Sequence, residues 1–390
     1  MKPTGKISLA KRVHNIKPFL AMEIMERAKA LESEGGKIIY LCLGEPDFPT
    51  PEPVIKRAIK AINDGETKYT HSLGRIELRN AIAEHYLKRY DVSISPDQIM
   101  ISSGTSPLML LLFAALCNPG DEIILSNPGY ACYPNFIRFV EGVPRFLKTS
   151  PDEGFQPRTD AIAKLINSRS RAVLINSPAN PSGSVLTKKQ MQELARLPLP
   201  LISDEIYHGL TYEGEEHSIL EFTSNAFVLG GFSKAYSMTG WRLGYLIAPL
   251  KAIRALQSFH QNFVISANSF VQLAGVAALQ QGQPYLERMR SEYSQRRRFL
   301  IPRLEALGLK IHARPSGAFY VLADARHLSK DSMKLALEIL NSTGVAVTPG
   351  IDFGSAAEGY LRFSYANSMG NLVEAMHRLE NFFQEKNWLS

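Results

Sequence analysis

Apolar side chains near the start of the chain recur at helical spacing. They stand at positions 19, 22, 24, 25, 28 and 31, which predicts an amphipathic helix from residue 18 to the glycine pair at 35–36. A short apolar run at 38–43 predicts a strand. The segment G-E-P-D-F-P-T-P at 44–51 holds three prolines, which exclude both a helix and a strand ladder. We therefore expect a rigid, extended crossing segment there, followed by helices at 54–62 and 78–90 with a loop at 69–74 between them.

Through the middle of the chain, apolar strands alternate with helices. Strands are expected at 98–102, 122–126, 143–147, 171–175, 200–203 and 227–230, and helices at 107–117 and 188–195. This alternation is typical of a mostly parallel sheet covered by helices on both faces. Most of these strands end in a polar or glycine-rich loop, and in such sheets ligands bind at the carboxyl ends of the strands.

In the last third of the chain, the regular alternation of strands and helices ends. A helix pair is expected at 252–282 and a long charged helix at 285–307, followed by strands at 310–312, 317–322, 345–348 and 360–364 and helices at 332–342 and 372–384. We therefore expect an α/β fold with a mostly parallel seven-stranded sheet flanked by helices, plus a smaller α+β domain. The expected division is an N-terminal arm and helix at 1–45 that joins the small domain, a large domain at 46–284, and the C-terminal small domain at 285–390.

Composition narrows the function classes. The net charge of +7 comes from dispersed basic residues with no block of five, so we expect no nucleic-acid partner; the densest run, Arg296–Arg298, is interpreted as a solvated helix face. No apolar run approaches the length of a membrane span, and no histidine motif indicates a metal site. Cys42, Cys117 and Cys132 form no C-x-x-C pair, which favours a reducing, cytoplasmic location.

The stretch F-S-K-A-Y-S-M-T-G-W-R-L-G-Y at 232–245 holds one lysine and one arginine without an acid between them. Lys234 lies among apolar residues, and a lysine in such surroundings loses proton affinity and becomes able to form a Schiff base with a carbonyl. Arg242 cannot deprotonate and indicates a bound anion, of which phosphate is the usual one. An aldehyde that carries a phosphate satisfies both, so the pair suggests pyridoxal phosphate.

Other polar residues follow predicted strands. S-S-G-T-S at 102–106 stands before a helix, where free N–H groups attract phosphate, although an ordinary N-cap gives the same pattern. Asp204 ends an apolar strand and could hold a pyridine nitrogen protonated, or cap the next helix. Asn180 lies between two prolines and could bond a phenolic oxygen, or only form a turn. Arg362 alternates with apolar residues on a strand and suits a carboxylate or an interface salt bridge.

Together and in this order, these motifs resemble the fold-type I pyridoxal-phosphate aminotransferases of class I, the aspartate-aminotransferase-like group. The resemblance covers nearly the whole chain, from Arg12 through G-E-P-D-F-P-T-P, N-P-S-G, D-E-I-Y, the lysine motif and L-R-F-S-Y. It implies a pyridoxal 5'-phosphate cofactor in the large domain and transfer of an amino group between an amino acid and a 2-oxo acid. It assigns the internal aldimine and proton transfer to Lys234, the pyridine nitrogen to Asp204, the phenolic oxygen to Tyr207 with Asn180, and ring stacking to Tyr130.

The resemblance also implies the remaining contacts of the cofactor and substrate. The phosphate falls to Gly104, Thr105, Ser106, Ser233 and Arg242, with Tyr69 reaching across from the partner subunit of a homodimer. The substrate α-carboxylate falls to Gly44 and Arg362, together with Asn180. Several aspartate-using relatives carry a lysine at the place of Ser106, so a neutral or aromatic substrate side chain is as plausible as aspartate.

Two other functions fit parts of the sequence. A C–S lyase or an aminocyclopropane-carboxylate synthase-like lyase would share the scaffold, but the S-M-T-G-W-R-L-G-Y continuation favours a transaminase. A non-catalytic aminotransferase-like domain of a transcription regulator would need a fused DNA-binding unit, and only about forty residues with one predicted helix precede G-E-P-D.

Overall fold

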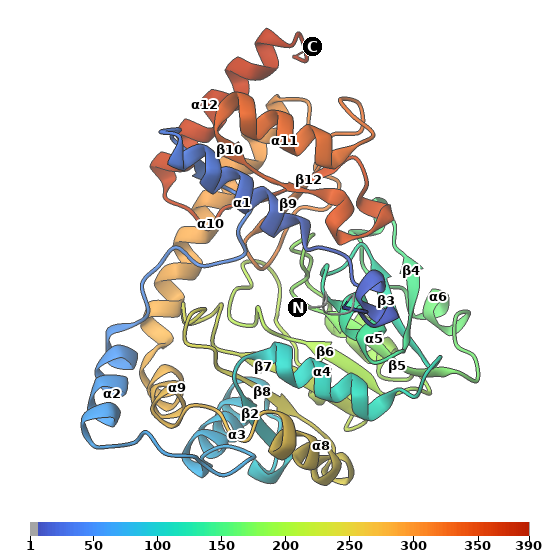
Figure 1. The fold of residues 1–390 in the computed structure, drawn as a ribbon, viewed down its shortest axis with the longest axis vertical. Helices are drawn as coiled ribbons and strands as arrows, with labels where there is room; N and C mark the ends of the chain where they lie inside the picture. The colour runs from blue at the N-terminus through green and yellow to red at the C-terminus, as the bar shows by residue number, and fades with distance from the viewer. Residues whose placement is uncertain (1–6, 390) are drawn as a thin grey trace, which may run out of the picture.

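The computed structural model describes residues 7–389 and is organised around one seven-stranded sheet (Figure 1). The spatial order of its strands is β2-β8-β7-β6-β5-β3-β4, and only β8 runs antiparallel to its neighbours. The strands are β2 (Ile99–Ser102), β3 (Glu122–Asn127), β4 (Val143–Lys148), β5 (Ser170–Asn176), β6 (Leu201–Asp204), β7 (Ala226–Gly231) and β8 (Gly244–Ile247). The predicted α/β fold with a mostly parallel seven-stranded sheet is confirmed.

The sequence located six of these strands and missed β8. This strand begins at the end of the lysine-arginine stretch, where four residues between a glycine-containing loop and Pro249 give too short a pattern to recognise. Because β8 is antiparallel to β7, the chain turns back on itself and Gly231 pairs with Gly244. Lys234 and Arg242 thus lie on one loop at the carboxyl end of β7.

Alternate residues of the central strands serve two hydrophobic layers. On β5, Ala172 and Leu174 pack on one side, while Val173 and Ile175 pack on the other, and all four are buried. The first side is covered by α4 (Thr105–Leu116), α5 (Tyr133–Phe139) and α8 (Leu250–Phe263). The second is covered by α3 (Ile76–Tyr90), α6 (Thr159–Ala163), α7 (Lys188–Leu194) and α9 (Ser269–Gln281), with α2 (Glu52–Asn63) packed on α9.

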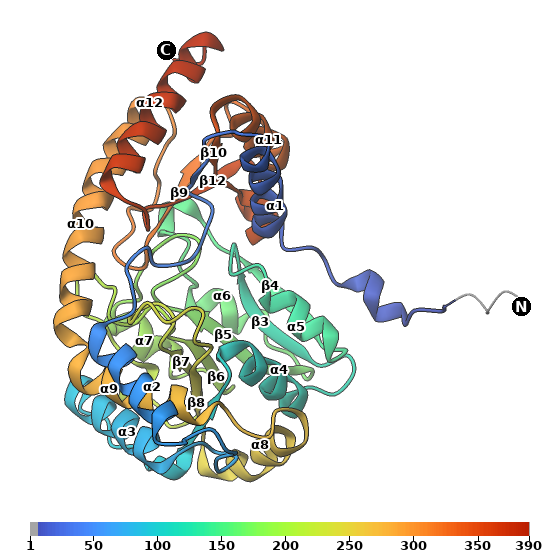
Figure 2. The same cartoon turned by 60° about the vertical axis from the view of Figure 1, so that its left-hand side comes forward.

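The C-terminal elements form a second, smaller assembly above the sheet (Figure 1). A three-stranded antiparallel sheet has the order β11-β12-β9, and a parallel pair joins β1 to β10. Helix α10 (Gln283–Ala306) runs along one side of the molecule from α9 to α12, as Figure 2 shows. The other elements are α1 (Leu20–Ser33), α11 (Ser332–Thr343), α12 (Met369–Glu385), β1 (Ile39–Tyr40), β9 (Tyr320–Asp324), β10 (Val345–Ala346), β11 (Thr348–Pro349) and β12 (Tyr360–Ser364).

Two expectations for the smaller assembly were wrong in detail. The strand expected at 310–312 is reduced to one bridge between Lys310 and Asp324. The strand expected at 38–43 forms a ladder only at β1, since proline-rich backbone follows soon after it. Through β1 the N-terminal segment nevertheless pairs with C-terminal strand β10.

The interpretation of Arg296–Arg298 as a solvated face was also wrong. Arg296 and Arg297 are buried, and only Arg298 is exposed. Arg296 donates to both carboxylate oxygens of Asp47 at 2.7 and 2.9 Å, which fastens the proline-rich segment to α10. Arg297 donates to the Pro315 carbonyl and to Glu213. Consecutive arginines are easily interpreted as solvent-exposed, because the sequence does not show the distant residues that pair with them in the fold.

None of the helices found between residues 7 and 389 is both long and apolar enough to cross a membrane. Over the same residues, no cluster of three or more His, Cys, Asp or Glu side chains could hold a metal ion.

The tie between Asp47 and Arg296 yields a stability prediction. Asp47→Ala would leave a buried guanidinium without its two-point partner, so the free energy of unfolding should fall by about 1–3 kcal/mol. Denaturant unfolding of the purified variant measures this loss. Asp152→Ala, at an exposed carboxylate, is the matched control and should change little. Equal midpoints for the two variants would contradict the prediction.

Candidate active site

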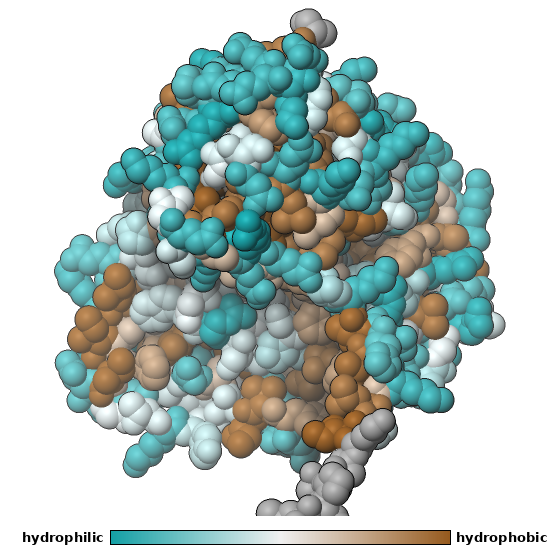
Figure 3. Space-filling model, turned by 45° about the horizontal axis from the view of Figure 1, so that its top comes forward, coloured by the Kyte–Doolittle hydropathy of each residue, from teal (hydrophilic) through white to brown (hydrophobic). Residues whose placement is uncertain are grey.

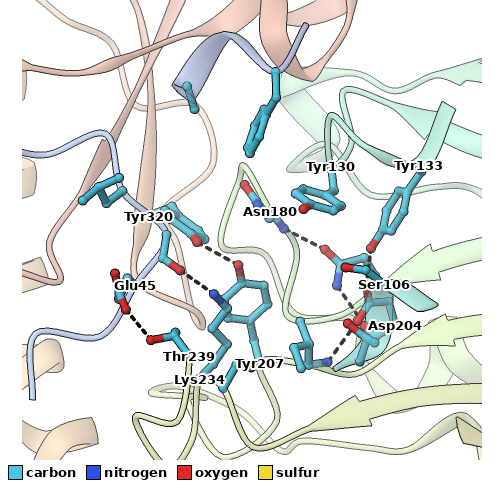
Figure 4. A pocket seen from close by; sticks show the side chains of 18 of the residues that line it. Glu45, Ser106, Tyr130, Tyr133, Asn180, Asp204, Tyr207, Lys234, Thr239 and Tyr320 are labelled. Carbon is cyan, nitrogen blue, oxygen red and sulfur yellow. Dashed lines mark hydrogen bonds between the residues drawn. The ribbon is translucent and has the colours of Figure 1, made fainter. Parts of the chain in front are cut away.

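A cavity of about 320 Å³ lies between the carboxyl ends of the large sheet and the smaller assembly. Figure 3 shows the surface hollowed between these two parts of the molecule, and Figure 4 shows the side chains that point into the cavity. The structure brings most of the residues proposed from the sequence to its lining: Gly44, Thr105, Ser106, Tyr130, Asn180, Asp204, Tyr207, Ser233, Lys234, Arg242 and Arg362.

Lys234 projects from the β7–β8 loop into this cavity. Its Nζ donates a hydrogen bond to the Gly44 carbonyl of the extended proline-rich segment and lies 6.0 Å from the centre of the Tyr207 ring. Removal from water disfavours the ammonium form and lowers the pKa of Lys234 to about 8, although Glu45 opposes this shift. The amine is therefore partly neutral near physiological pH.

Asp204 ends β6 and is buried. Its Oδ2 accepts from the Tyr133 hydroxyl at 2.6 Å, and its Oδ1 accepts from the Ile206 N–H at 3.1 Å. Burial raises the pKa of Asp204 to about 6, against the effect of these two donors. The Asn176 amide donates to the Asp204 carbonyl at 2.8 Å, which holds the ends of β5 and β6 together. The carboxylate is thus fixed in position.

The N-terminus of α4 forms another side of the site. Gly104 precedes this helix with φ of +89°, and no side chain caps the helix. The first N–H groups of α4 are therefore free to bind an anion, whose charge the helix dipole favours. A Cβ on Gly104 would lie 2.7 Å from Nη2 of Arg242, so only glycine lets the guanidinium approach. Thr105, Ser106 and Ser233 line the cavity alongside.

Arg362 lies on β12 and is 2% exposed. One terminal nitrogen donates to Oδ1 of Asn180 at 2.8 Å, and the other donates to the Cys42 carbonyl at 2.7 Å. The guanidinium lies between the rings of Tyr320 and Phe353, at 4.2 and 4.8 Å from their centres. Its Nε is buried and has no hydrogen-bond partner among residues 7–389. A buried cation without a paired carboxylate is suited to bind an external one.

Aromatic rings enclose the cavity. Tyr130 contacts the edges of Phe19 and Tyr133, with ring centres 6.2 and 5.1 Å apart. On the opposite wall, the hydroxyls of Tyr207 and Tyr320 lie 2.7 Å apart (Figure 4). A flat heteroaromatic ligand therefore meets a stacking face and phenolic groups within one enclosure.

Two predicted site residues are absent from the cavity lining: Gly104, which stands directly before α4 beside Arg242, and Tyr69. The Tyr69 side chain is 83% exposed on a loop of the outer surface. Sequence reasoning in turn missed several lining residues: Phe19, Glu45, Tyr133, Asn176, Thr239 and Tyr320. Tyr133 is the first residue of α5, and its hydroxyl reaches Asp204, a residue 71 positions later in the chain, which no local pattern shows. Phe19 and Tyr320 come from the smaller assembly, and no local pattern shows where they meet the sheet.

Comparison with known proteins agrees with this geometry. The family model for class I and II aminotransferases matches residues 36–379. An aspartate/prephenate aminotransferase from Thermus thermophilus is 39% identical, and the alignment covers 95% of this chain and 97% of that one. A (5-formylfuran-3-yl)methyl phosphate transaminase from Methanocaldococcus jannaschii is 38% identical, with coverage of 97% and 100%.

A solved structure agrees along the whole fold. The aspartate aminotransferase of Thermus thermophilus, solved with maleate, superposes with a TM-score of 0.92 at 38% identity and covers 96% of this chain and 100% of its own. The fold, the cavity with its buried lysine, and the full-length sequence match all agree: the chain belongs to the class I and II aminotransferases.

Proposed function

We propose that the cavity binds pyridoxal 5'-phosphate and moves an amino group between an amino acid and a 2-oxo acid. This proposal is supported above all by three functional groups that meet at one cavity. They are the partly neutral amine of Lys234, the buried carboxylate of Asp204, and the N-terminus of α4 with Arg242, which suits an anion. Known class I and II aminotransferases use this cofactor, and the class supports the proposal.

The residues present fit each part of the cofactor. The free N–H groups of α4 with Arg242 suit a phosphate dianion, and Tyr130 supplies a ring face. The fixed carboxylate of Asp204 suits a protonated ring nitrogen, because it offers a buried acceptor whose other bonds are already made. Tyr207 and Asn180 offer polar groups to a phenolic oxygen.

In the proposed reaction, the cofactor when bound draws electrons from the substrate α-carbon and so makes its proton acidic. Lys234 in its neutral form accepts that proton, and a pKa of about 8 allows the amine to hold and release a proton near neutral pH. Arg362, a buried cation whose terminal nitrogens meet only neutral acceptors among the described residues, binds the substrate α-carboxylate together with Asn180 and Gly44 and so orients the α-carbon.

We further propose a homodimer in which Tyr69 completes the partner's phosphate site. Tyr69, Phe263 and Ile265 are exposed by 83%, 74% and 48%. The Thr70 N–H donates to the Ser266 hydroxyl oxygen at 3.4 Å, so the loops that carry Tyr69 and Ile265 lie side by side with these apolar side chains exposed. A surface of this kind on a single chain indicates a contact with another one.

The domain division and location are also proposals. The pairing of β1 with β10 supports joining residues 1–45 to 285–390 as the small domain, with 46–284 as the cofactor-binding domain; residues 1–6 and 390 lie outside the described residues. The three cysteines are free thiols, which supports the cytoplasm as the location.

The lysine pKa gives a direct test on the protein from which any bound cofactor has been removed. Because the reactive form of an amine is the neutral one, labelling of Lys234 by trinitrobenzenesulfonate should reach half its maximal rate near pH 8, where free lysine needs about pH 10.4. Peptide mapping across a pH series measures this rate. A midpoint above pH 10 would show that the amine is not desolvated.

Replacement of the lysine should stop the reaction. Lys234→Ala should lower the rate of 2-oxo acid formation by at least about 1000-fold, since the group that moves the proton is lost, while Lys251→Ala at an exposed position should have no effect. Coupled assays of 2-oxo acid and spectra of the cofactor-loaded proteins measure both. An active Lys234→Ala protein would refute the proposal, and ammonia release without an acceptor would indicate a lyase.

A mixing experiment tests the shared site. Lys234→Ala and Tyr69→Ala chains, each impaired alone, should regain about a quarter of wild-type activity when co-expressed, because half of the dimers then hold one complete site. Light scattering should give twice the chain mass of 43.4 kDa. If Tyr69 served its own chain, the mixed dimers would show no recovery.

A further inference from the structure

We propose that the site selects amino acids with an apolar or aromatic side chain and rejects dicarboxylic ones. This inference rests on the proposed function and concerns the part of the cavity that the cofactor and the α-carboxylate leave. The proposed selection differs from the substrate in the names of the aspartate aminotransferase relatives. The residues of this chain must therefore account for it.

The first observation is the count of cations in the cavity. Among the described residues, the lining holds Lys234, Arg242 and Arg362 and no other lysine, arginine or histidine. Lys234 is the reacting amine, Arg242 lies against the α4 N-terminus, and Arg362 faces the α-carboxylate. A second carboxylate would be removed from water without a cation to pair with, which strongly disfavours its binding.

The second observation is the nature of the remaining wall. Phe19 and Met22 lie at the start of α1, Leu43 precedes the proline-rich segment, and Met109 stands on the inner face of α4. These four residues are apolar and line the same cavity, and we call them the side-chain wall. Thioether and aromatic groups adapt to large apolar side chains, and Phe19, whose ring is nearly perpendicular to that of Tyr130, places an aromatic group beside the proposed position of the cofactor ring.

The polar groups beside this wall agree with the same selection. Ser106, which stands beside the anion site, carries no charge that could meet a second carboxylate. Glu45 is an acid in the lining and repels another carboxylate. Electrostatics and apolar contact therefore favour the same class of substrate.

The third observation is that the wall is held in place. The Asp352 carboxylate accepts from the N–H groups of Leu20 and Ala21 at 2.9 and 3.2 Å, at the first turn of α1. The next residue, Phe353, lies against the guanidinium of Arg362. Residues 352–353 thus contact both Arg362 and the start of α1, beside Phe19. The group that binds the substrate α-carboxylate and the group that meets its side chain are therefore fixed relative to each other.

The test is the half-reaction of the cofactor-loaded wild-type protein with single amino acids. L-phenylalanine and L-leucine should convert the cofactor and release their 2-oxo acids with a second-order rate constant at least about 100-fold above that of L-aspartate or L-glutamate. Binding of unreactive acids gives an independent readout by calorimetry: 3-phenylpropanoate should bind more tightly than succinate by a similar factor.

Variants then test whether the side-chain wall and the absence of a further cation cause the preference for apolar amino acids. Phe19→Ala and, as a milder change, Phe19→Leu should lower the rate constant for phenylalanine about 10-fold or more while the cofactor spectrum stays unchanged. Ser106→Lys should raise the rate constant for aspartate about 10-fold or more, because it supplies the absent cation. Met369→Ala, on the exposed start of α12, is the control.

The outcomes separate this inference from the proposed function. Reaction with aspartate or glutamate in preference to phenylalanine, or tighter binding of succinate, would overturn the side-chain selection and leave the transaminase proposal intact. No conversion with any amino acid of either class would overturn the transaminase proposal itself. Equal rates for wild type and Phe19→Ala with phenylalanine would remove the side-chain wall from the explanation.

Discussion

The site depends on a close approach between two backbone segments. A Cβ on Gly244 would lie 2.7 Å from the carbonyl carbon of Gly104 and 2.8 Å from the Thr105 nitrogen, so the start of β8 and the start of α4 can meet this closely because position 244 is glycine. This contact brings the loop that holds Lys234 and Arg242 against the helix terminus. The lysine and the anion site come from distant parts of the chain, and their separation is set by this packing of main chain on main chain.

The buried charges of the protein fall into two kinds. Glu216 is fully bonded: Oε1 accepts from Arg89 and the Tyr90 hydroxyl, and Oε2 accepts from the Gly209 N–H and the Thr211 hydroxyl. Such a cluster has no capacity left for a ligand. The cavity differs, because among the described residues Lys234 and Arg362 line it as buried cations without a carboxylate partner, and their hydrogen bonds go to carbonyl oxygens, an amide and a hydroxyl. Incomplete pairing in an enclosed place is what marks the functional site.

The sequence predicted much of the fold, because long apolar periodicities such as the one at 78–90 depend on neighbouring residues alone. It predicted lining residues at several strand ends, as at Asp204 on β6, although it missed Asn176 at the end of β5. It failed where the outcome depends on a distant partner: the burial of Arg297 by Glu213 and Pro315, or the entry of Tyr320 from another sheet. The resemblance supplied roles for single residues, but not the contacts that hold them.

The two edges of the large sheet bear on how the protein behaves in solution. At one edge, the Ile101 N–H of β2 donates to the Leu73 carbonyl, so a loop already covers that strand. At the other edge, β4 contains Pro144, which has no N–H to offer, and carries the charges of Arg145 and Lys148. Both devices discourage a further strand from adding to the sheet. Aggregation by continuous strand pairing is therefore disfavoured, and the faces of the molecule that carry side chains are left as the surfaces through which another chain could bind.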